Sequence, residues 1–392
     1  MPALYIHIPF CVARCPYCDF NSYVGLEALY EPYCAALTAE IRRAGARYGR
    51  PRATTLFIGG GTPTVLPLTL LAQVLDACRS AFDLAGDAEI TCEANPGTVD
   101  QHSFSGLRNL GVNRLSLGVQ SFDDDELRWL GRIHSAAEAR AAFHAGRRAG
   151  FDNINLDLIF GLPHQDPRIW ARTLSQALAL CPEHLSLYSL TVEPGTPLAT
   201  RVSQGLEASP DDDLAAQLYE VGCATLAAAG YEHYEISNWA RGMRLDEPSP
   251  FVCRHNLTYW HAEPYLGFGA GAHSYMTEGD TSRVGQRWWN VASVEEYIRR
   301  VETGQSPVAD GEVIDRRLAM GEVMMLGLRL VQEGVTDERF RSRFGCELEE
   351  VFGDEIRDLV GRGLLERLPD RVRLTRQGCL LGNQVFAAFL PG

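Results

Sequence analysis

Short runs of alternating apolar and polar residues recur along the first half of the chain, separated by longer stretches with helical spacing. Alternation predicts strands, and the longer stretches, rich in Ala, Leu and Arg, predict helices. The predicted strands are Leu4 to Pro9, Thr55 to Gly60, Glu89 to Ala94, Arg114 to Gln120, Asn153 to Ile159 and His184 to Leu190. The clearest predicted helices are Leu29 to Tyr48, Leu68 to Phe82 and Ala136 to Ala149. Strands alternating with helices in this way predict an α/β fold, a partial (β/α)6 barrel of TIM type with the helices outside.

The alternation also assigns residues to the two faces of the predicted sheet. In an open barrel the apolar face packs against the helices, and the polar face lines the interior. The polar positions include Tyr5, Glu93, Gln120 and Asp157, whose strand neighbours form the apolar set. We therefore expect these four side chains inside the barrel.

The pattern changes in the second half of the chain. Strand, turn and glycine signals continue from Tyr231 to Asn290 without a regular strand and helix period, and a linker follows near Thr303 to Gly311. The remaining segment predicts a helix, a short helix, a third helix and a strand pair, the order of a winged-helix-like module. We predict three parts: a barrel over 1–235, an extension over 236–303, and a small, helical, winged-helix-like C-terminal domain over 304–392.

Charge and composition exclude several classes of function. The net charge is −14, and all 36 basic residues are arginine, so no lysine is present for a phosphate loop, a pyridoxal Schiff base or a lysine nucleophile. Nine arginines against ten acidic residues over 337–376 favour a structural or lid role for the winged-helix-like module over DNA binding. We expect no nucleic-acid partner.

The apolar runs are short. Leu156 to Leu162 is interrupted well below the roughly 20 residues needed to cross a bilayer. A predicted strand begins within four residues of the N-terminus, which leaves no room for a signal peptide. We therefore expect no transmembrane segment and place the chain in the cytoplasm.

Three of the eleven cysteines form a cluster in the sequence. Cys11, Cys15 and Cys18 follow the first predicted strand as CxxxCxxC. Thiolates are soft ligands suited to iron–sulfur clusters, and three within eight residues can converge on one [4Fe-4S] cluster and leave one iron open. An open iron can bind S-adenosylmethionine by its amino and carboxylate groups. The alternatives are a zinc site, which would want a fourth ligand at finger-like spacing, or three unrelated thiols.

The surrounding residues extend this motif. IPFCxxxCPYCDF at 8–20, followed by GGGTPT at 59–64, resembles the radical-SAM family, and within it the oxygen-independent coproporphyrinogen III oxidases and their relatives. The resemblance implies that S-adenosylmethionine is bound by Tyr5, Tyr17, Gly60, Gly61, Thr62, Glu93, Gln120, Arg132 and Asp157. The alternation argument already places four of these inside the barrel, whereas Arg132 depends on the resemblance alone. Solvated or salt-bridged carboxylates are the alternative for Glu93 and Asp157.

Two features separate an oxidase from a chaperone. The oxidases have CxxxCxxCxC and a longer segment ahead of it, whereas this chain has Asp19 and Phe20 after the third cysteine and only ten residues before Cys11. The segment HNLTYW at 255–260 resembles the signature of the HemW-type heme chaperones. This resemblance implies that His255 binds the heme iron through its imidazole and that Asn256 orients the imidazole. Tyr259 and Trp260 would lie against the porphyrin.

Other interpretations of this region remain open. A histidine beside aromatic residues is, taken alone, more often packed and hydrogen-bonded than a ligand, and His261, His273 and Cys253 are alternate ligands nearby. Residues 267–272 imitate a dinucleotide fingerprint, but no strand-to-helix unit supports it, so we expect a tight backbone near the bound ligand instead.

The sequence thus predicts a chaperone with three cofactors: a [4Fe-4S] cluster, S-adenosylmethionine and heme. Its partners would be heme and acceptor heme proteins, which the sequence does not identify, and transient contact with membrane-bound heme enzymes is compatible with this function. The alternatives are the oxidase, which decarboxylates coproporphyrinogen III to protoporphyrinogen IX, and a radical-SAM enzyme that modifies RNA, which the negative charge disfavours. Whether the chain is an enzyme stays open, and we assign no catalytic residue.

Overall fold

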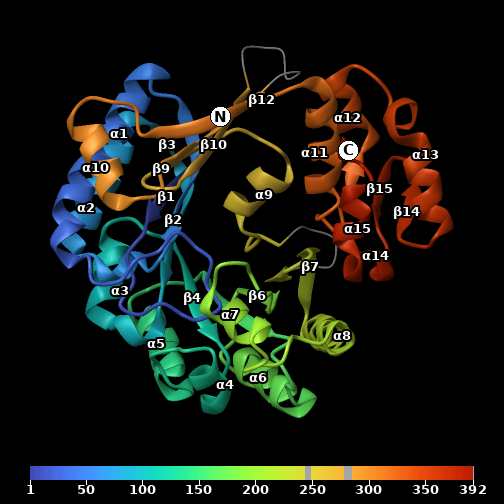
Figure 1. Cartoon of the computed structure of the whole chain (residues 1–392), viewed down its shortest axis with the longest axis horizontal. Helices are drawn as coiled ribbons and strands as arrows, with labels where there is room; N and C mark the ends of the chain where they lie inside the picture. Colours follow the sequence, from blue (N-terminus) through green and yellow to red (C-terminus); the bar gives the residue numbers. More distant parts are fainter. Residues whose placement is uncertain (243–248, 278–284, 392) are drawn as a thin grey trace.

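Six parallel strands curve into an open barrel in the computed structural model, which describes residues 1–242, 249–277 and 285–391 (Figure 1). The strands are adjacent in chain order. They are β1 (Ala3–Ile8), β2 (Arg52–Gly60), β3 (Asp83–Ala94), β4 (Arg114–Gln120), β5 (Ile154–Phe160) and β6 (His184–Ser189). The predicted partial (β/α)6 barrel is confirmed, and β3 begins six residues earlier than the pattern indicated.

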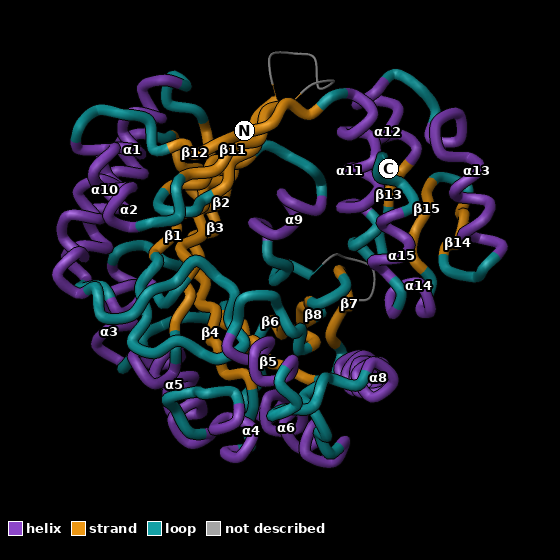
Figure 2. Tube along the Cα trace, viewed as in Figure 1, coloured by secondary structure: helices purple, strands orange, loops and turns teal. Residues whose placement is uncertain are grey.

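Helices cover the outer face of this sheet (Figure 2). They are α1 (Tyr30–Arg47), α2 (Leu68–Ala81), α3 (Gln101–Asn109), α4 (Asp124–Trp129), α5 (Ala136–Arg148), α6 (Pro167–Ala179) and α8 (Asp212–Ala228), with short 3-10 turns at Glu27–Leu29, Pro63–Val65 and Pro96–Thr98. The short α7 (Pro197–Ser203) lies instead against the loop after β1, where Leu198 N donates to Pro16 O at 2.9 Å. Capping side chains determine where several of these helices begin. α5 begins after Ser135, whose side chain forms a capping box with Glu138.

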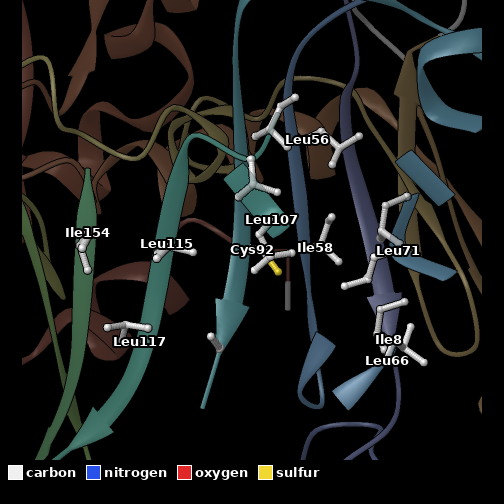
Figure 3. Packing of buried hydrophobic residues seen from close by; sticks show 14 of the residues in the cluster. Ile8, Leu56, Ile58, Leu66, Leu71, Cys92, Leu107, Leu115, Leu117 and Ile154 are labelled. Atoms are coloured by element: carbon white, nitrogen blue, oxygen red, sulfur yellow. The ribbon is translucent and has the colours of Figure 1, made fainter. Parts of the chain in front are cut away.

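The apolar sides of the strands form the main core. Figure 3 shows Ile58, Cys92 and Leu115 on neighbouring strands, with Leu71 of α2 and Leu107 of α3 packed in the same layer, and all five are at most 1% exposed. Burying one such aliphatic side chain stabilises the fold by about 1.5–3 kcal/mol. This layer holds the strands in register, so the alternate residues of each strand point to the opposite, inner face.

The same sheet continues beyond the six parallel strands, to twelve in the described chain. On the β1 side, β9 (Tyr265–Phe268) pairs parallel with β1, and β10 (His273–Thr277), β11 (Gly285–Asn290) and β12 (Val308–Ile314) follow antiparallel. At the other edge β8 (Asn238–Arg241) and β7 (Tyr231–Glu235) follow β6. The helix α9 (Arg254–Trp260) lies inside the curve of the sheet, whereas α10 (Val294–Glu302) packs outside against α1 (Figure 1).

The C-terminal segment has a separate core. It contains α11 (Arg316–Gly327), β13 (Val335–Thr336), α12 (Asp337–Phe344), α13 (Leu348–Gly361), β14 (Leu365–Leu368), β15 (Arg371–Leu374), α14 (Arg376–Leu380) and α15 (Gly382–Ala387). Phe340, Phe344, Phe352 and Phe389 are fully buried within it. The predicted order of helices and strand pair is observed, and β13 adds a third strand. The boundaries of the three predicted parts stay predictions. The described residues contain no helix long and apolar enough to span a membrane.

Candidate functional site

A cavity of about 500 Å³ opens at the carboxyl ends of the barrel strands. Ligands of α/β barrels bind at this end, because the loops after the strands converge there. Most of the predicted cofactor residues line it: Cys11, Cys15, Tyr17, Cys18, Gly60, Gly61, Thr62, Glu93, Gln120, Arg132 and Asp157. Tyr5 does not line it.

The loop after β1 presents the three cysteines to the cavity. It closes on itself, because Cys11 N donates to Tyr23 O at 2.9 Å and Tyr23 N donates to Pro9 O at 2.7 Å. Arg132 Nη1 donates to Cys15 Sγ at 3.3 Å and Thr62 Oγ1 to Cys11 Sγ at 3.6 Å. Burial raises the pKa of the Cys11 thiol, and the contact from Thr62 opposes that rise. In the part of the chain that the structure describes, no three His, Cys, Asp or Glu side chains converge closely enough to hold a single metal ion.

The glycine-rich end of β2 lies directly against this loop. Gly61 N donates to Ile8 O at 2.8 Å, and Thr62 N donates to Phe10 O at 2.7 Å. A Cβ on Gly61 would lie 2.6 Å from Phe10 O, and Gly60, with φ +112°, would place a Cβ 2.5 Å from the imidazole of His7. Only glycine permits this approach. The backbone therefore borders the cavity without side chains in the way.

Two carboxyl groups face the cavity in different surroundings. Glu93 accepts one hydrogen bond, from Gly60 N at 3.1 Å, and burial followed by the charge of Asp157 raises its pKa to about 8. Asp157 accepts hydrogen bonds from Ser116 Oγ at 3.0 Å and from Asn155 Nδ2 at 2.8 Å. Burial raises the pKa of Asp157, but these donors oppose the rise. Asp157 is therefore the better stabilised as an anion, and Glu93 retains a proton near neutral pH.

The end of β4 supplies the remaining polar groups. A register irregularity between Gly118 and Gln120, with φ +67° at Gln120, redirects this strand end at the cavity. Arg132 Nη2 donates to Gly118 O at 2.9 Å, while its buried Nε has no partner among the described residues. An unpartnered guanidinium N–H, two carboxyl groups, open glycine backbone and three thiols fit an iron–sulfur cluster with a ligand that carries an amino acid moiety.

The predicted heme segment lies elsewhere, in α9. His255 is 1% exposed, and its ring is stacked on Phe57 with centroids 5.2 Å apart. Its Nδ1 lies 2.9 Å from Thr55 Oγ1 and its Nε2 lies 3.0 Å from Tyr259 Oη. Burial, followed by the charge of Arg114, lowers the pKa of His255 to about 3. Both ring nitrogens thus have protein partners, so iron ligation by His255 stays a prediction that requires one of these hydrogen bonds to break.

The neighbours of His255 are packed in a similar way. Tyr5 lies beneath the cavity, with its hydroxyl 3.0 Å from His7 Nδ1 and its ring 6.5 Å from that of His255. The Arg329 guanidinium lies 4.4 Å from the centroid of the Trp260 ring. The segment therefore fills the space between the barrel and the C-terminal core.

The three residues that the sequence offers as alternate heme ligands differ in how exposed they are. His261 Nε2 contacts Glu333 at 3.1 Å, and Cys253 is buried with Sγ 3.7 Å from Glu89 Oε1. His273 is exposed on β10. Residues 267–272 span the end of β9 and the turn into β10, which agrees with the sequence-based rejection of a dinucleotide site, since a strand and not a helix follows.

Several cavity residues were missed by the sequence analysis. Ser116 and Tyr188 line the cavity, and Asn155 holds Asp157 from behind. The alternation pattern places Ser116 and Asn155 on the inner face, so that signal was available. Tyr188 has no comparable signal, because its role as a lining residue depends on how the end of β6 curves.

Comparisons with known proteins agree with this geometry. Residues 5–177 match the radical SAM superfamily, and residues 314–381 match the HemN C-terminal domain. The chain is 40% identical over 392 residues to the heme chaperone HemW of Bacillus subtilis (strain 168), covering 100% of this chain and 99% of that protein. It is 36% identical over 395 residues to HemW of Escherichia coli (strain K12), covering 99% and 98% respectively.

A solved structure also resembles the chain over its length. The radical SAM coproporphyrinogen III oxidase HemN from Escherichia coli matches with a TM-score of 0.81 and 23% identity, covering 99% of this chain and 90% of that one. At this identity the likeness shows the fold. Barrel, cysteine loop and glycine-rich strand end together define a radical-SAM protein. Within that class, the full-length similarity places the chain in the HemW family of heme chaperones.

Proposed function

We propose that the chain binds heme and transfers it to heme-requiring proteins, and that it carries a [4Fe-4S] cluster and S-adenosylmethionine in the barrel cavity. The observation that carries this proposal is the full-length similarity to proteins named heme chaperones. The cavity supports it, because Phe20, 64% exposed, stands at the position where the oxidases have a fourth cysteine. An apolar ring at the mouth offers a surface to a porphyrin rather than another ligand to a metal.

The residues around the cavity have separate tasks in this proposal. Cys11, Cys15 and Cys18 hold the cluster, and Arg132 holds the Cys15 side chain in place through its contact with Sγ at 3.3 Å. Gly60 and Gly61 give the methionine part of S-adenosylmethionine close access to the backbone. When bound, the cluster can supply an electron that cleaves the sulfonium bond of S-adenosylmethionine.

The remaining candidate residues orient the cofactor. Asp157 presents a charged carboxylate held by Ser116 and Asn155, which suits it to accept hydrogen bonds from hydroxyl or ammonium groups. Glu93 is the more readily protonated of the two carboxyl groups, so it can donate as well as accept. Thr62, Gln120 and Tyr17 complete the wall. Tyr5 acts from below, through its contact with His7.

Partners and compartment are part of the same proposal. The partners are heme and acceptor heme proteins, and the cytoplasm is the proposed compartment. All eleven cysteines are free in the structure, which suits a reducing environment. Transient contact with membrane-bound heme enzymes is compatible with this arrangement.

A paired measurement tests the proposal. The purified, cluster-loaded protein is titrated with heme, and the same preparation is assayed anaerobically, with reductant and S-adenosylmethionine, for decarboxylation of coproporphyrinogen III. We expect saturable heme binding and no decarboxylation. Turnover of coproporphyrinogen without heme binding would establish the oxidase instead.

A further inference from the structure

The Ser22 side chain lies in the wall of the cofactor cavity without a hydrogen-bond partner. Ser22 comes four residues after Cys18, lines the cavity and is 3% exposed. Its Oγ is buried and makes no hydrogen bond with any residue that the structure describes. Burial of an unpaired hydroxyl costs free energy, so such a group indicates a partner other than the protein's own polar atoms.

The backbone on both sides of Ser22 is held in place. Before it, Asn21 Nδ2 donates to Ala270 O, in the turn between β9 and β10, at 3.0 Å. After it, Tyr23 N donates to Pro9 O at 2.7 Å. Ser22 cannot leave the cysteine loop without breaking these hydrogen bonds. Its hydroxyl therefore has a fixed position in the loop.

The Ser22 hydroxyl lies close to two of the three clustered cysteines. Burial raises the pKa of the Cys11 thiol, and the hydroxyls of Thr62 and Ser22 oppose this rise. Burial also raises the pKa of the Cys18 thiol, and the backbone N–H of Phe20 and the Ser22 hydroxyl oppose it. One hydroxyl that acts on both thiols is within reach of either sulfur.

The charge on these sulfurs decides whether Ser22 has an acceptor. A thiol sulfur accepts hydrogen bonds weakly, whereas a thiolate bound to iron carries negative charge and accepts a charge-assisted one. Ligation of iron by Cys11 and Cys18 would thus give the Ser22 hydroxyl the acceptor that the thiols do not provide. Hydrogen bonds to the sulfurs help to set the reduction potential of an iron–sulfur cluster, because they stabilise the added negative charge of its reduced state.

We propose that Ser22 donates a hydrogen bond to the cysteine sulfurs of the cluster and raises its reduction potential. This inference rests on the [4Fe-4S] cluster of the proposed function and names a residue that adjusts it. Reduction adds one electron to the cluster, from a low-potential one-electron donor. The Ser22 hydroxyl keeps its proton throughout, so the step breaks no covalent bond and moves no proton.

Redox titration of the cluster tests this role. Ser22→Ala removes the hydroxyl, and Ser22→Thr retains one. Each cluster-loaded protein is titrated anaerobically with a low-potential reductant, and the reduced cluster is followed by electron paramagnetic resonance. We expect the equilibrium constant for one-electron reduction to fall about tenfold in Ser22→Ala, which makes the midpoint potential about 59 mV more negative. Ser22→Thr should keep the potential of the parent.

Thr91→Val is the matched control for loss of a buried hydroxyl. Among the described residues, Thr91 on β3 has the one other buried hydroxyl without a hydrogen-bond partner, and it does not line the cavity. This variant should keep both the iron content and the reduction potential of the parent. A shift confined to Ser22→Ala would then report the hydroxyl beside the cluster.

Three other results would overturn the inference. If Ser22→Ala has the iron content and the potential of the parent, the hydroxyl does not contact the cluster, and the cluster assignment stands. If Ser22→Ala takes up no cluster while Thr91→Val does, Ser22 is needed to hold the cluster and does not merely adjust its potential. If the parent itself takes up no cluster, the proposed function fails and the inference fails with it.

Discussion

His184 accepts a hydrogen bond at Nε2 from the Tyr234 hydroxyl, 2.9 Å away, inside the barrel. Its other nitrogen, Nδ1, donates to Asn155 Oδ1 at 2.7 Å, and Asn155 Nδ2 donates to Asp157. At the other end Cys253 N donates to the Tyr234 hydroxyl at 3.3 Å. Burial lowers the pKa of His184 well below its usual value, which agrees with a neutral ring that donates once and accepts once. This chain of hydrogen bonds joins the start of α9 to the carboxylate of the cofactor cavity.

Replacing Tyr234 with Phe tests that chain. The change removes the hydroxyl between His184 and Cys253 N, so it leaves a buried acceptor and a buried donor unpaired. We expect the free energy of unfolding to fall by about 1–3 kcal/mol, measured by urea denaturation of the cluster-loaded protein. Tyr48→Phe, at the partly exposed end of α1, is the control and should change stability by less than about 0.5 kcal/mol. If the two variants were equally stable, the chain of hydrogen bonds through Tyr234 would contribute nothing to the free energy of unfolding.

The pH dependence of stability tests the environment of Glu93. Its pKa is raised to about 8, so its contribution to stability is fully present below the unfolded value near 4.5 and is lost as the pH rises through about 8. Glu93→Gln removes this loss. We expect the variant to gain about 4 kcal/mol relative to the parent between about pH 5 and pH 9, measured by denaturation across that range. A constant difference between the two proteins would show that Glu93 ionises normally.

Removing one thiol tests the cluster assignment. Cys11→Ser replaces a soft thiolate with a hydroxyl, so we expect the bound iron and the visible absorption of the cluster to fall to a small fraction of the parent after anaerobic reconstitution. Cys223→Ser, a partly buried cysteine of α8, is the matched control and should retain both. Full iron content in Cys11→Ser would exclude Cys11 as a ligand.

The geometry of the Arg132 guanidinium at the cavity can be tested separately from its positive charge. Arg132→Lys keeps the positive charge but loses the fork that contacts both Cys15 Sγ and Gly118 O. We expect S-adenosylmethionine to bind about tenfold more weakly, measured by equilibrium dialysis with the cluster in place. Arg128→Lys, at an exposed position of α4, should bind it as the parent does. An unchanged affinity in Arg132→Lys would place this arginine outside the binding site.

Much of the barrel was predictable because alternation reports which strand face is buried. The pattern identified six parallel strands and placed Glu93, Gln120 and Asp157 on the face that lines the cavity. Tyr5 shares that face but lies midway along β1, below the cavity. Position along a strand depends on how the sheet curves, which alternation does not report.

The helix α9 shows most clearly what the sequence does not predict. The letters HNLTYW reveal neither that the helix folds back into the barrel nor that Thr55, two hundred residues earlier, occupies a nitrogen of His255. The motif letters do not reveal either that the pairing of β10 with β11 brings His273 beside Trp289. Sequence motifs identified the family, whereas the partners of each side chain required the structure.

Heme is cargo for this protein, and the rate at which the protein transfers heme to an acceptor tests this most directly. The heme-loaded protein, with its cluster and S-adenosylmethionine, is mixed anaerobically with an apo heme protein, and the rate at which the acceptor gains heme is followed by absorption at increasing acceptor concentration. The account predicts intact heme in the acceptor and a rate that rises with acceptor concentration, because transfer occurs in a complex of the two proteins. A rate equal to that of heme dissociation into buffer at every acceptor concentration would contradict it.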